Sequence, residues 1–274
     1  MYINLSTLDN LNKVMSILLH KGHGKDPCSD RSYRTISNCT VLAKALDAYL
    51  GTINIPLWDK SQIDIQFQGK NSSHDLASLQ TTELILYSNN VLKRPLYALF
   101  LDAKSCFDRV RVQNVIKNAY RTGTSDSSLN LINNRLSNRS SFIKFNNDVI
   151  GPIYDSLGVK QGGLLSDRLF RLVGNDQLLF AQLSNLGAPL HYPNHHSPEQ
   201  IPKITISAIG QADDTALFSN DLFSLNLLAS LSDQYANRTN TIFVPDKTKL
   251  VAFVDNKLKY IPPPRIIFEP NFFV

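Results

Sequence analysis

The sequence of 274 residues predicts an α+β protein, on three observations. Hydrophobic residues make up 43% of the chain and charged residues 19%, which is enough apolar material for a folded core. Apolar residues recur at helical spacing in several long segments, whereas shorter segments are continuously apolar or alternate like strands. The two kinds of segment alternate without the regular repeat of a parallel barrel, which favours an α+β arrangement.

A helix is predicted near the N-terminus, over residues 5–19. Its apolar side chains recur every three or four positions: Leu8, Leu11, Val14, Met15 and Leu18. The next segment, residues 20–34, is polar and contains two glycines and a proline, so it is expected to be a loop.

Two further helices and a buried strand are predicted before the middle of the chain. The helices cover residues 40–50, with Thr40 or Asn38 as the N-cap, and residues 74–93. Residues 96–101 (LYALFL) follow a proline and form a continuous apolar run, which is typical of a buried strand.

The rest of the chain is predicted to mix helices, strands and loops. Helical patterns cover residues 110–120, 128–136, 164–184 and 221–235. Strand patterns cover residues 141–145 and 148–157, as a hairpin turning at Asn146 and Asn147, and residues 203–209, 215–218, 248–254 and 265–268. Loops are expected at residues 158–163 (GVKQGG), 187–202 and 261–264.

Several classes of protein are excluded by the composition. No apolar run reaches the ~18 residues of a membrane helix, and the N-terminus lacks the pattern of a secretory signal. We therefore expect an intracellular protein, in the nucleus or the cytoplasm, with no membrane partner. The three cysteines, Cys28, Cys39 and Cys106, form no C-x-x-C pair, so a disulfide scaffold is not expected.

The positive charge of the chain is concentrated in one stretch. The net charge is +5 and the isoelectric point is near 9.0. Residues 93–145 hold ten basic side chains and only three acidic ones, Asp102, Asp108 and Asp126. Such a stretch is either a solvated face or a surface that binds an anionic partner such as nucleic acid.

Three aspartates occur where apolar strands are predicted to end. Asp102 closes the run LYALFL, and Asp213 and Asp214 lie between two apolar strand segments. A half-buried aspartate is costly unless it is paired or binds a cation, although an Asp-Asp pair is also common in hairpin turns. Three convergent carboxylates would form a hard oxygen site for Mg²⁺. Two such ions can assist a phosphoryl transfer.

Four segments in order resemble motifs of reverse transcriptases: FLDAKSCFDRV (residues 100–110), GVKQGGLLSD (158–167), QADDTALFS (211–219) and DKTKLVAF (246–253). The QGG and ADDTAL forms resemble those of non-LTR (LINE-type) retrotransposons. Two upstream segments resemble the fingers region of the same family: YRTISNCTVLAKALDAYL (33–50) and KNSSHDLASL (70–79). The resemblance extends over most of the chain, from about residue 11 to residue 253.

The resemblance implies a right-hand polymerase fold with the thumb absent. Residues 1–94 would be a fingers-like part, and residues 95–274 a palm-like part with an antiparallel sheet. The implied activity is RNA-directed DNA polymerisation by a two-metal mechanism with Mg²⁺, or alternatively Mn²⁺. The implied partners are an RNA template, a DNA primer and deoxynucleoside triphosphates; no protein partner is indicated.

The family motifs also imply roles at the metal and sugar sites. Asp102 and Asp213 would bind the metal ions, with Asp214 beside them. Phe107 would exclude a ribose 2′-hydroxyl, although its bland interpretation is a core phenylalanine. Gln161 and Gly162 precede a helix and would lie close to the nucleotide or the template.

Basic residues are implied to bind the triphosphate. Arg34 would do so with Lys25 or Lys21, because a guanidinium group binds phosphate through two parallel hydrogen bonds. Lys247 resembles the family lysine near the leaving pyrophosphate; its alternative is a surface lysine next to Lys249.

Departures from the family motifs leave two other functions open. Gln211, Asp167 and Thr35 stand where the family usually has other residues, and no endonuclease segment is recognised. A catalytically inactive nucleic-acid-binding remnant of a decayed or truncated element is therefore the main alternative. An RNA-directed RNA polymerase is a second one, which Phe107 and QGG disfavour. His191, His195 and His196 lack a nearby cysteine and are expected to be surface residues rather than zinc ligands.

Overall fold

The computed structural model describes residues 11–22, 24–29, 32–68, 73–145, 147–191 and 203–260. The chain forms two compact units whose sequences are interleaved. The first unit comprises Met1–Ser61 and Ser105–Val173, and the second comprises Gln62–Lys104 and Gly174–Val274. The predicted boundary between a fingers-like part (residues 1–94) and a palm-like part (residues 95–274) is a different division of the chain and stays a prediction.

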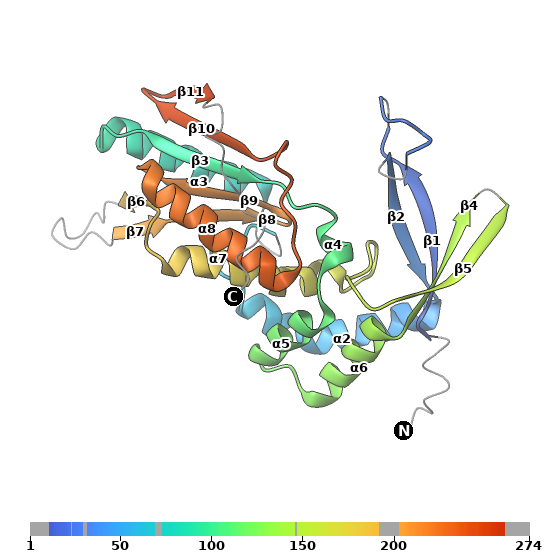
Figure 1. Cartoon of the computed structure of the whole chain (residues 1–274). Helices are drawn as coiled ribbons and strands as arrows, with labels where there is room; N and C mark the ends of the chain where they lie inside the picture. The colour runs from blue at the N-terminus through green and yellow to red at the C-terminus, as the bar shows by residue number, and fades with distance from the viewer. Residues whose placement is uncertain are drawn as a thin grey trace, which may run out of the picture. The chain divides into compact units, whose positions relative to one another are not determined.

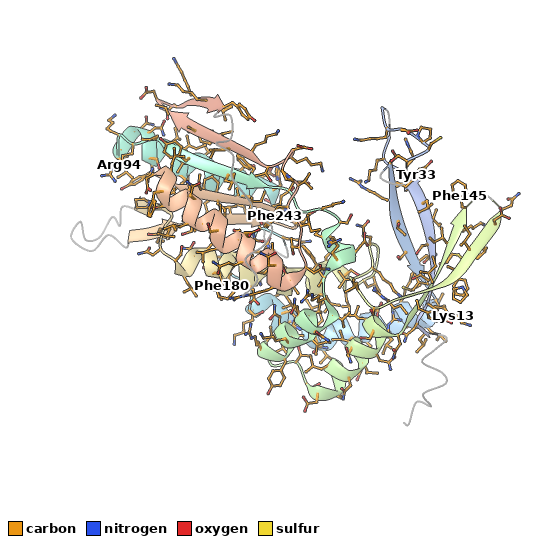
Figure 2. The ribbon with its side chains drawn as sticks, viewed as in Figure 1. Lys13, Tyr33, Arg94, Phe145, Phe180 and Phe243 are labelled. Carbon is orange, nitrogen blue, oxygen red and sulfur yellow. The ribbon has the colours of Figure 1, made fainter. Side chains whose placement is uncertain are left out.

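The first unit contains a four-stranded sheet of order β2-β1-β4-β5. Its strands are β1 (Lys13–His20), β2 (Tyr33–Cys39), β4 (Arg139–Phe145) and β5 (Asp148–Asp155). Strand β1 pairs antiparallel with β2 and parallel with β4, and β4 and β5 form the predicted hairpin. Figure 2 labels Tyr33, the first residue of β2, and Phe145, the last residue of β4.

The predicted helix over residues 5–19 is wrong for residues 13–19, and residues 5–10 lie outside the described part. Val14 and Ser16 are buried, whereas Met15, Ile17 and Leu19 on the opposite face are 37–52% exposed. This burial alternates with the period of two that a strand requires. Because both faces of β1 carry apolar residues, some of them also fall at helical spacing, which explains the wrong prediction.

Helices form the rest of the first unit: α2 (Val41–Lys60), α4 (Cys106–Arg109), α5 (Val112–Arg121), α6 (Asp126–Ser137) and the start of α7 (Ser166–Leu183). Thr40 caps α2 as predicted, because its side chain accepts a hydrogen bond from the backbone N–H of Ala43. The helix continues ten residues beyond the predicted end at residue 50. Its last turns are anchored by the buried Trp58, whose indole N–H donates to Thr124 at 2.9 Å.

The second unit contains a five-stranded sheet of order β11-β10-β3-β9-β8, in which every pair is antiparallel. Its strands are β3 (Leu96–Leu101), β8 (Ala208–Gln211), β9 (Asp214–Ser219), β10 (Lys249–Val254) and β11 (Lys257–Tyr260). The helical elements of this unit are α3 (His74–Leu86), η2 (Tyr87–Val91), the end of α7 and α8 (Leu222–Thr239). In Figure 1, α8 crosses in front of β3 and β9, and α3 passes behind the sheet. The unit therefore has one core, centred on β3 and β9, where Leu99, Leu217 and Phe218 are at most 1% exposed.

Three strand predictions differ from the structure in the second unit. The expected loop over residues 187–202 contains strand β6 (Ala188–His191), which pairs with β7 (Lys203–Ile206). The expected strand over residues 203–209 is two strands that separate at Ser207, whose N–H donates to the Gln182 side chain. Strand β11 was not predicted, and the expected strand over residues 265–268 lies outside the described residues.

Among the helices of the described part, none combines the length and the apolar character that crossing a membrane requires.

Candidate active site

Asp102 follows directly after the central strand of the second unit. Strand β3 lies between β10 and β9, and its last residue, Leu101, is only 3% exposed. The backbone carbonyl of Asp102 accepts a hydrogen bond from Val244 at 2.9 Å, whereas its side chain is 33% exposed. The chain therefore leaves the core at Asp102 with the backbone held and the carboxylate facing solvent.

Asp213 and Asp214 lie at the tight turn between β8 and β9. Gln211 pairs with Asp214, so Ala212 and Asp213 form a two-residue hairpin turn. Ala212 adopts φ +58°, a left-handed conformation that normally favours glycine. A positive φ at the first turn position only is the pattern of a type II′ turn.

The register of β3 and β9 brings the two acidic segments to one end of the sheet. Leu101 pairs with Thr215 at the last described position of the ladder. The next residues beyond this pair are Asp102 on β3 and Asp214 on β9, so these two aspartates lie at the same end of the sheet. Residues far apart in sequence thus become neighbours through strand pairing.

Lys247 lies in the segment just before β10 and forms an ion pair with Asp102. Its ammonium group donates to both carboxylate oxygens of Asp102, at 3.1 and 3.2 Å. The Lys247 side chain is 65% exposed, so the pair is accessible to solvent. The location follows from the antiparallel pairing of β10 with β3, which brings the residues before β10 next to the end of β3.

A cavity of about 540 Å³ opens beside these residues. It is lined by Asp102, Asp214, Lys247 and Gln211 and by His74, Ser78, Thr81 and Thr82 on one face of α3. Its apolar part includes Phe100, Ile209 and Ala216. The Oε1 atom of Gln211 is buried and has no hydrogen-bond partner among the described residues. The cavity has the size of a small-molecule site and combines charged, polar and apolar walls.

The carboxylates influence one another electrostatically. Partial burial raises the pKa of Asp214 above its ordinary value of 3.8, and the negative charges of Asp213 and Asp102 raise it further. The positive charges of Lys247 and His74 act in the opposite direction on the same pKa. The site is thus a concentration of negative charge that is only partly neutralised by nearby cations.

A divalent cation is compatible with this donor set. Carboxylate oxygens are the ligands that Mg²⁺ prefers, and the ammonium group on Asp102 marks the place as attractive to cations. Within the described residues, no group of three or more acidic, histidine or cysteine side chains forms a complete metal site. Mg²⁺ commonly uses one or two carboxylates and takes its other ligands from water and substrate phosphates, so an incomplete protein site fits this ion.

Apart from Lys247, the predicted nucleotide-contacting residues belong to the first unit. Arg34 is an exposed residue of β2, and Lys25 is exposed in the loop between β1 and β2. The turn before α7 lies against the same strand, because the Ser37 N–H donates to the Gln161 carbonyl at 2.9 Å. Gly162 has φ +94°, and a Cβ there would be 3.1 Å from the Ser37 carbonyl oxygen. The structure thus brings Gln161 and Gly162 next to the strand that carries Arg34.

Phe107 also belongs to the first unit, in the short helix α4. Its ring is half-buried and stacks on Phe170 of α7, with ring centroids 4.5 Å apart and an interplanar angle of 21°. The backbone carbonyl of Phe107 accepts a hydrogen bond from Val159 at 2.7 Å. The ring is therefore neither a fully buried core residue nor a free surface one.

Sequence reasoning missed three features of the cavity beside Asp102 and of the surroundings of Phe107. Nothing in the sequence indicated that His74 lines the cavity, since it was only the first residue of a predicted helix. Lys247 was expected near a leaving pyrophosphate, and its pairing with Asp102 depends on strand order. Phe170 was an ordinary apolar residue of a predicted helix, and only the fold pairs it with Phe107.

Comparisons with known proteins give a family and a fold for this chain. A family model described as reverse transcriptase (RNA-dependent DNA polymerase) matches residues 21–261. A comparison with curated protein sequences finds no match.

Solved telomerase structures share the fold. Apo telomerase from Candida tropicalis has a TM-score of 0.62 and 12% identity, over 94% of this chain and 50% of that chain. Telomerase from Candida albicans in complex with a TWJ fragment of telomeric RNA has a TM-score of 0.61 and 10% identity, over 94% and 47%. The chain thus spans about half the length of these structures. The predicted α+β fold with an antiparallel sheet, as in polymerase fingers and palm, is confirmed.

Proposed function

Because this chain belongs to the reverse transcriptase (RNA-dependent DNA polymerase) family, we propose that it carries the polymerase core of a non-LTR retrotransposon and synthesises DNA on an RNA template. The observation that carries the proposal is that Asp102 and Asp214 lie at the same end of the β3–β9 pair, with Lys247 ion-paired to Asp102. Carboxylates at one edge beside an open cavity are what a metal-dependent nucleotidyl transfer requires. The non-LTR assignment rests on the QGG and ADDTAL forms of the two central motifs.

The second unit supplies the residues for the transfer itself. Asp102 and Asp213 would hold two ions, Mg²⁺ or Mn²⁺, with Asp214 beside them. Once bound, such ions stabilise the attacking and the leaving oxygens of an in-line displacement at phosphorus. Lys247 is close enough to Asp102 to offer its ammonium group to an anionic triphosphate once the carboxylate is occupied. Its role at the leaving pyrophosphate belongs to this proposal.

The first unit supplies the residues for the incoming deoxynucleotide. Arg34 and Lys25 (or Lys21) bind the triphosphate, and Gln161 and Gly162 offer backbone close to it. A glycine at Gly162 leaves the backbone accessible, because its positive φ and its closeness to Ser37 disfavour any side chain. Phe107 excludes a ribose 2′-hydroxyl and so selects deoxynucleotides. The exposed basic residues of the stretch over residues 93–145, which extends over both units, bind the template and primer backbones with little sequence preference. Arg135 and Arg139 do not contribute, because both are buried and Arg135 is ion-paired with Asp47.

Primer extension tests the proposed function directly. The full chain is supplied with a poly(A) template, an oligo(dT) primer, dTTP and Mg²⁺, and extension of the primer is measured. Asp213→Asn removes a charged metal ligand and is expected to abolish extension. Asp233→Asn is the matched control, because this aspartate is in α8 of the same unit and its carboxylate accepts a hydrogen bond from the Asn237 side chain. Extension that Asp213→Asn does not reduce would contradict the proposed site.

The inactive nucleic-acid-binding remnant is the second candidate, favoured by Gln211 in the position before Ala-Asp-Asp. The side-chain amide oxygen of Gln211 is buried without a hydrogen-bond partner in the described structure, and this residue lines the cavity. The family usually has an aromatic or small residue at this position. Salt-dependent binding of template and primer without extension in Mg²⁺ or Mn²⁺ would favour this candidate.

A further inference from the structure

The segment that carries Phe107 is fastened to the turn before α7. The Val159 N–H donates to the Phe107 carbonyl, and the Gly158 N–H donates to the Val110 carbonyl, both at 2.7 Å. One residue further in each direction, Arg111 and Leu157 form an isolated β-bridge. Helix α4 therefore cannot shift independently of this turn.

Gly158 makes the closest backbone approach in this connection. It has φ +79°, and a Cβ at this position would be 2.7 Å from the backbone of Asp108. An alanine here would be strained by its backbone conformation and would also push the residue that follows Phe107. Any side chain at Gly158 thus forces the Gly158 segment and the backbone of α4 apart.

Phe170 fixes the ring of Phe107 from one side. Phe170 is only 8% exposed, so its ring is held by the packing of the first unit. The two rings are nearly parallel, at 21°, with centroids 4.5 Å apart. Such aromatic pairs add about 0.5–1.5 kcal/mol beyond the area they bury. The stack therefore restricts the ring, while the backbone hydrogen bonds restrict its attachment.

We propose that Gly158 and Phe170 are positioning residues that determine how strictly Phe107 excludes a ribose 2′-hydroxyl. The inference rests on the proposed function, in which Phe107 contacts the sugar of the incoming nucleotide. Steric exclusion of a single oxygen atom requires a ring that cannot move aside, and sites of this kind are sensitive to displacements of about 1 Å. Two contacts outside the nucleotide site thus set its sugar selectivity.

Nucleotide binding to a blocked complex tests this inference without requiring catalysis. The full chain is bound to a poly(A) template and a dideoxy-terminated oligo(dT) primer in Mg²⁺. The Kd is then measured for dTTP and for 5-methyluridine triphosphate, which differ only in the 2′-hydroxyl. We expect the wild type to prefer dTTP by about 100-fold, a typical limit for a pocket that rejects one added hydroxyl.

Substitutions at Phe170 distinguish the stack from general stability. Phe170→Met keeps most of the buried volume but removes the ring, and should reduce the preference by about tenfold. Phe170→Tyr keeps the ring and should preserve the preference. Leu169→Ala is the control: this neighbour is 3% exposed in the same helix, so its truncation lowers stability without touching the stack. Gly158→Ala provides an independent perturbation and should reduce the preference as Phe170→Met does.

Each result decides the inference. A reduced preference in Phe170→Met and Gly158→Ala, but not in Phe170→Tyr or Leu169→Ala, supports it. If Phe170→Met prefers dTTP as strongly as the wild type does, the positioning role is refuted. If Phe170→Met does not fold, an unchanged preference for dTTP in Gly158→Ala refutes it instead. A wild type that binds both nucleotides equally, or binds neither, also refutes it. Extension of an unblocked primer is recorded in parallel. Extension with unchanged preference refutes only the positioning role, whereas altered preference without extension refutes only the proposed activity.

Discussion

Removing the ammonium group of Lys247 should strengthen the binding of divalent cations to the aspartate site. This group donates to both oxygens of Asp102 at 3.1 and 3.2 Å. A cation that uses the same oxygens must displace it and is also repelled by its charge. Lys247→Met keeps most of the length of the side chain and removes both effects.

The magnitude follows from the distance and the exposure of the pair. Two unit charges about 3 Å apart attract each other by about 1.4 kcal/mol in water. Lys247 is 65% exposed and Asp102 33% exposed, so solvent screening and side-chain entropy reduce the value. Exposed ion pairs typically contribute about 0.2–1 kcal/mol, which corresponds to a gain of up to about fivefold in cation affinity.

Mn²⁺ is a suitable probe, because the electron paramagnetic resonance signal of the free ion falls as it binds. Titrations of the wild type and Lys247→Met give the two dissociation constants at the same ionic strength. Lys249→Met is the control, since Lys249 is two residues away and its ammonium group donates to the Asp246 carbonyl instead. Equal or weaker Mn²⁺ binding by Lys247→Met, with Lys249→Met unchanged, would refute the competition between lysine and metal. Primer extension by Lys247→Met should fall despite the tighter metal binding if Lys247 also contacts the triphosphate.

Three further predictions concern the hairpin between β8 and β9, which carries Ala212, Asp213 and Asp214. The pKa of Asp214 is raised in the folded protein, so its ionisation destabilises the metal-free fold as pH rises from about 3.8 through the folded pKa. Asp214→Asn should therefore raise the melting temperature at pH 7 in EDTA, and the gain should shrink toward pH 4; a gain independent of pH would contradict this reasoning. Ala212→Gly should stabilise the fold by up to about 1 kcal/mol in urea unfolding, because glycine adopts φ +58° without the cost that alanine has there; a loss of stability would show that the turn is not strained. Asp213→Asn should bind template and primer at least as tightly as the wild type, since one negative charge near phosphates is removed, and the affinity should fall with salt. Binding that does not depend on salt would exclude the basic stretch as a phosphate-binding surface.

Helices and strands with a single apolar face or a distinct cap were predictable from the sequence. Strand β3 was predicted with its observed bounds because LYALFL is continuously apolar after a proline. The start of α2 was predicted because a threonine precedes its apolar pattern. Strand β1 was not, because the exposed Met15, Ile17 and Leu19 give it apolar residues on both faces. Local patterns fail where a strand is not amphipathic.

The candidate site was predictable only as a set of residues. Motif order indicated Asp102, Asp213 and Asp214, but periodicity carries no information on which strands pair. The register that aligns Leu101 with Thr215 comes from the packing of the whole sheet. The Lys247–Asp102 ion pair and the Phe107–Phe170 stack depend on the same kind of long-range pairing. Their functional roles remain predictions that the experiments above test.

The division into two units separates residues that lie close together in one motif. Asp102 belongs to the second unit and Phe107 to the first, although only four residues lie between them. The boundary between Lys104 and Ser105 thus falls inside the motif. One short segment therefore supplies a metal-binding candidate to one unit and a sugar-contacting candidate to the other. Because each residue is held by its own unit, metal affinity and sugar preference should respond to different substitutions. Lys247→Met should change Mn²⁺ affinity without changing the preference for dTTP, and Phe170→Met should do the reverse. If either substitution changed both quantities equally, the two halves of the motif would have to act as one structural element.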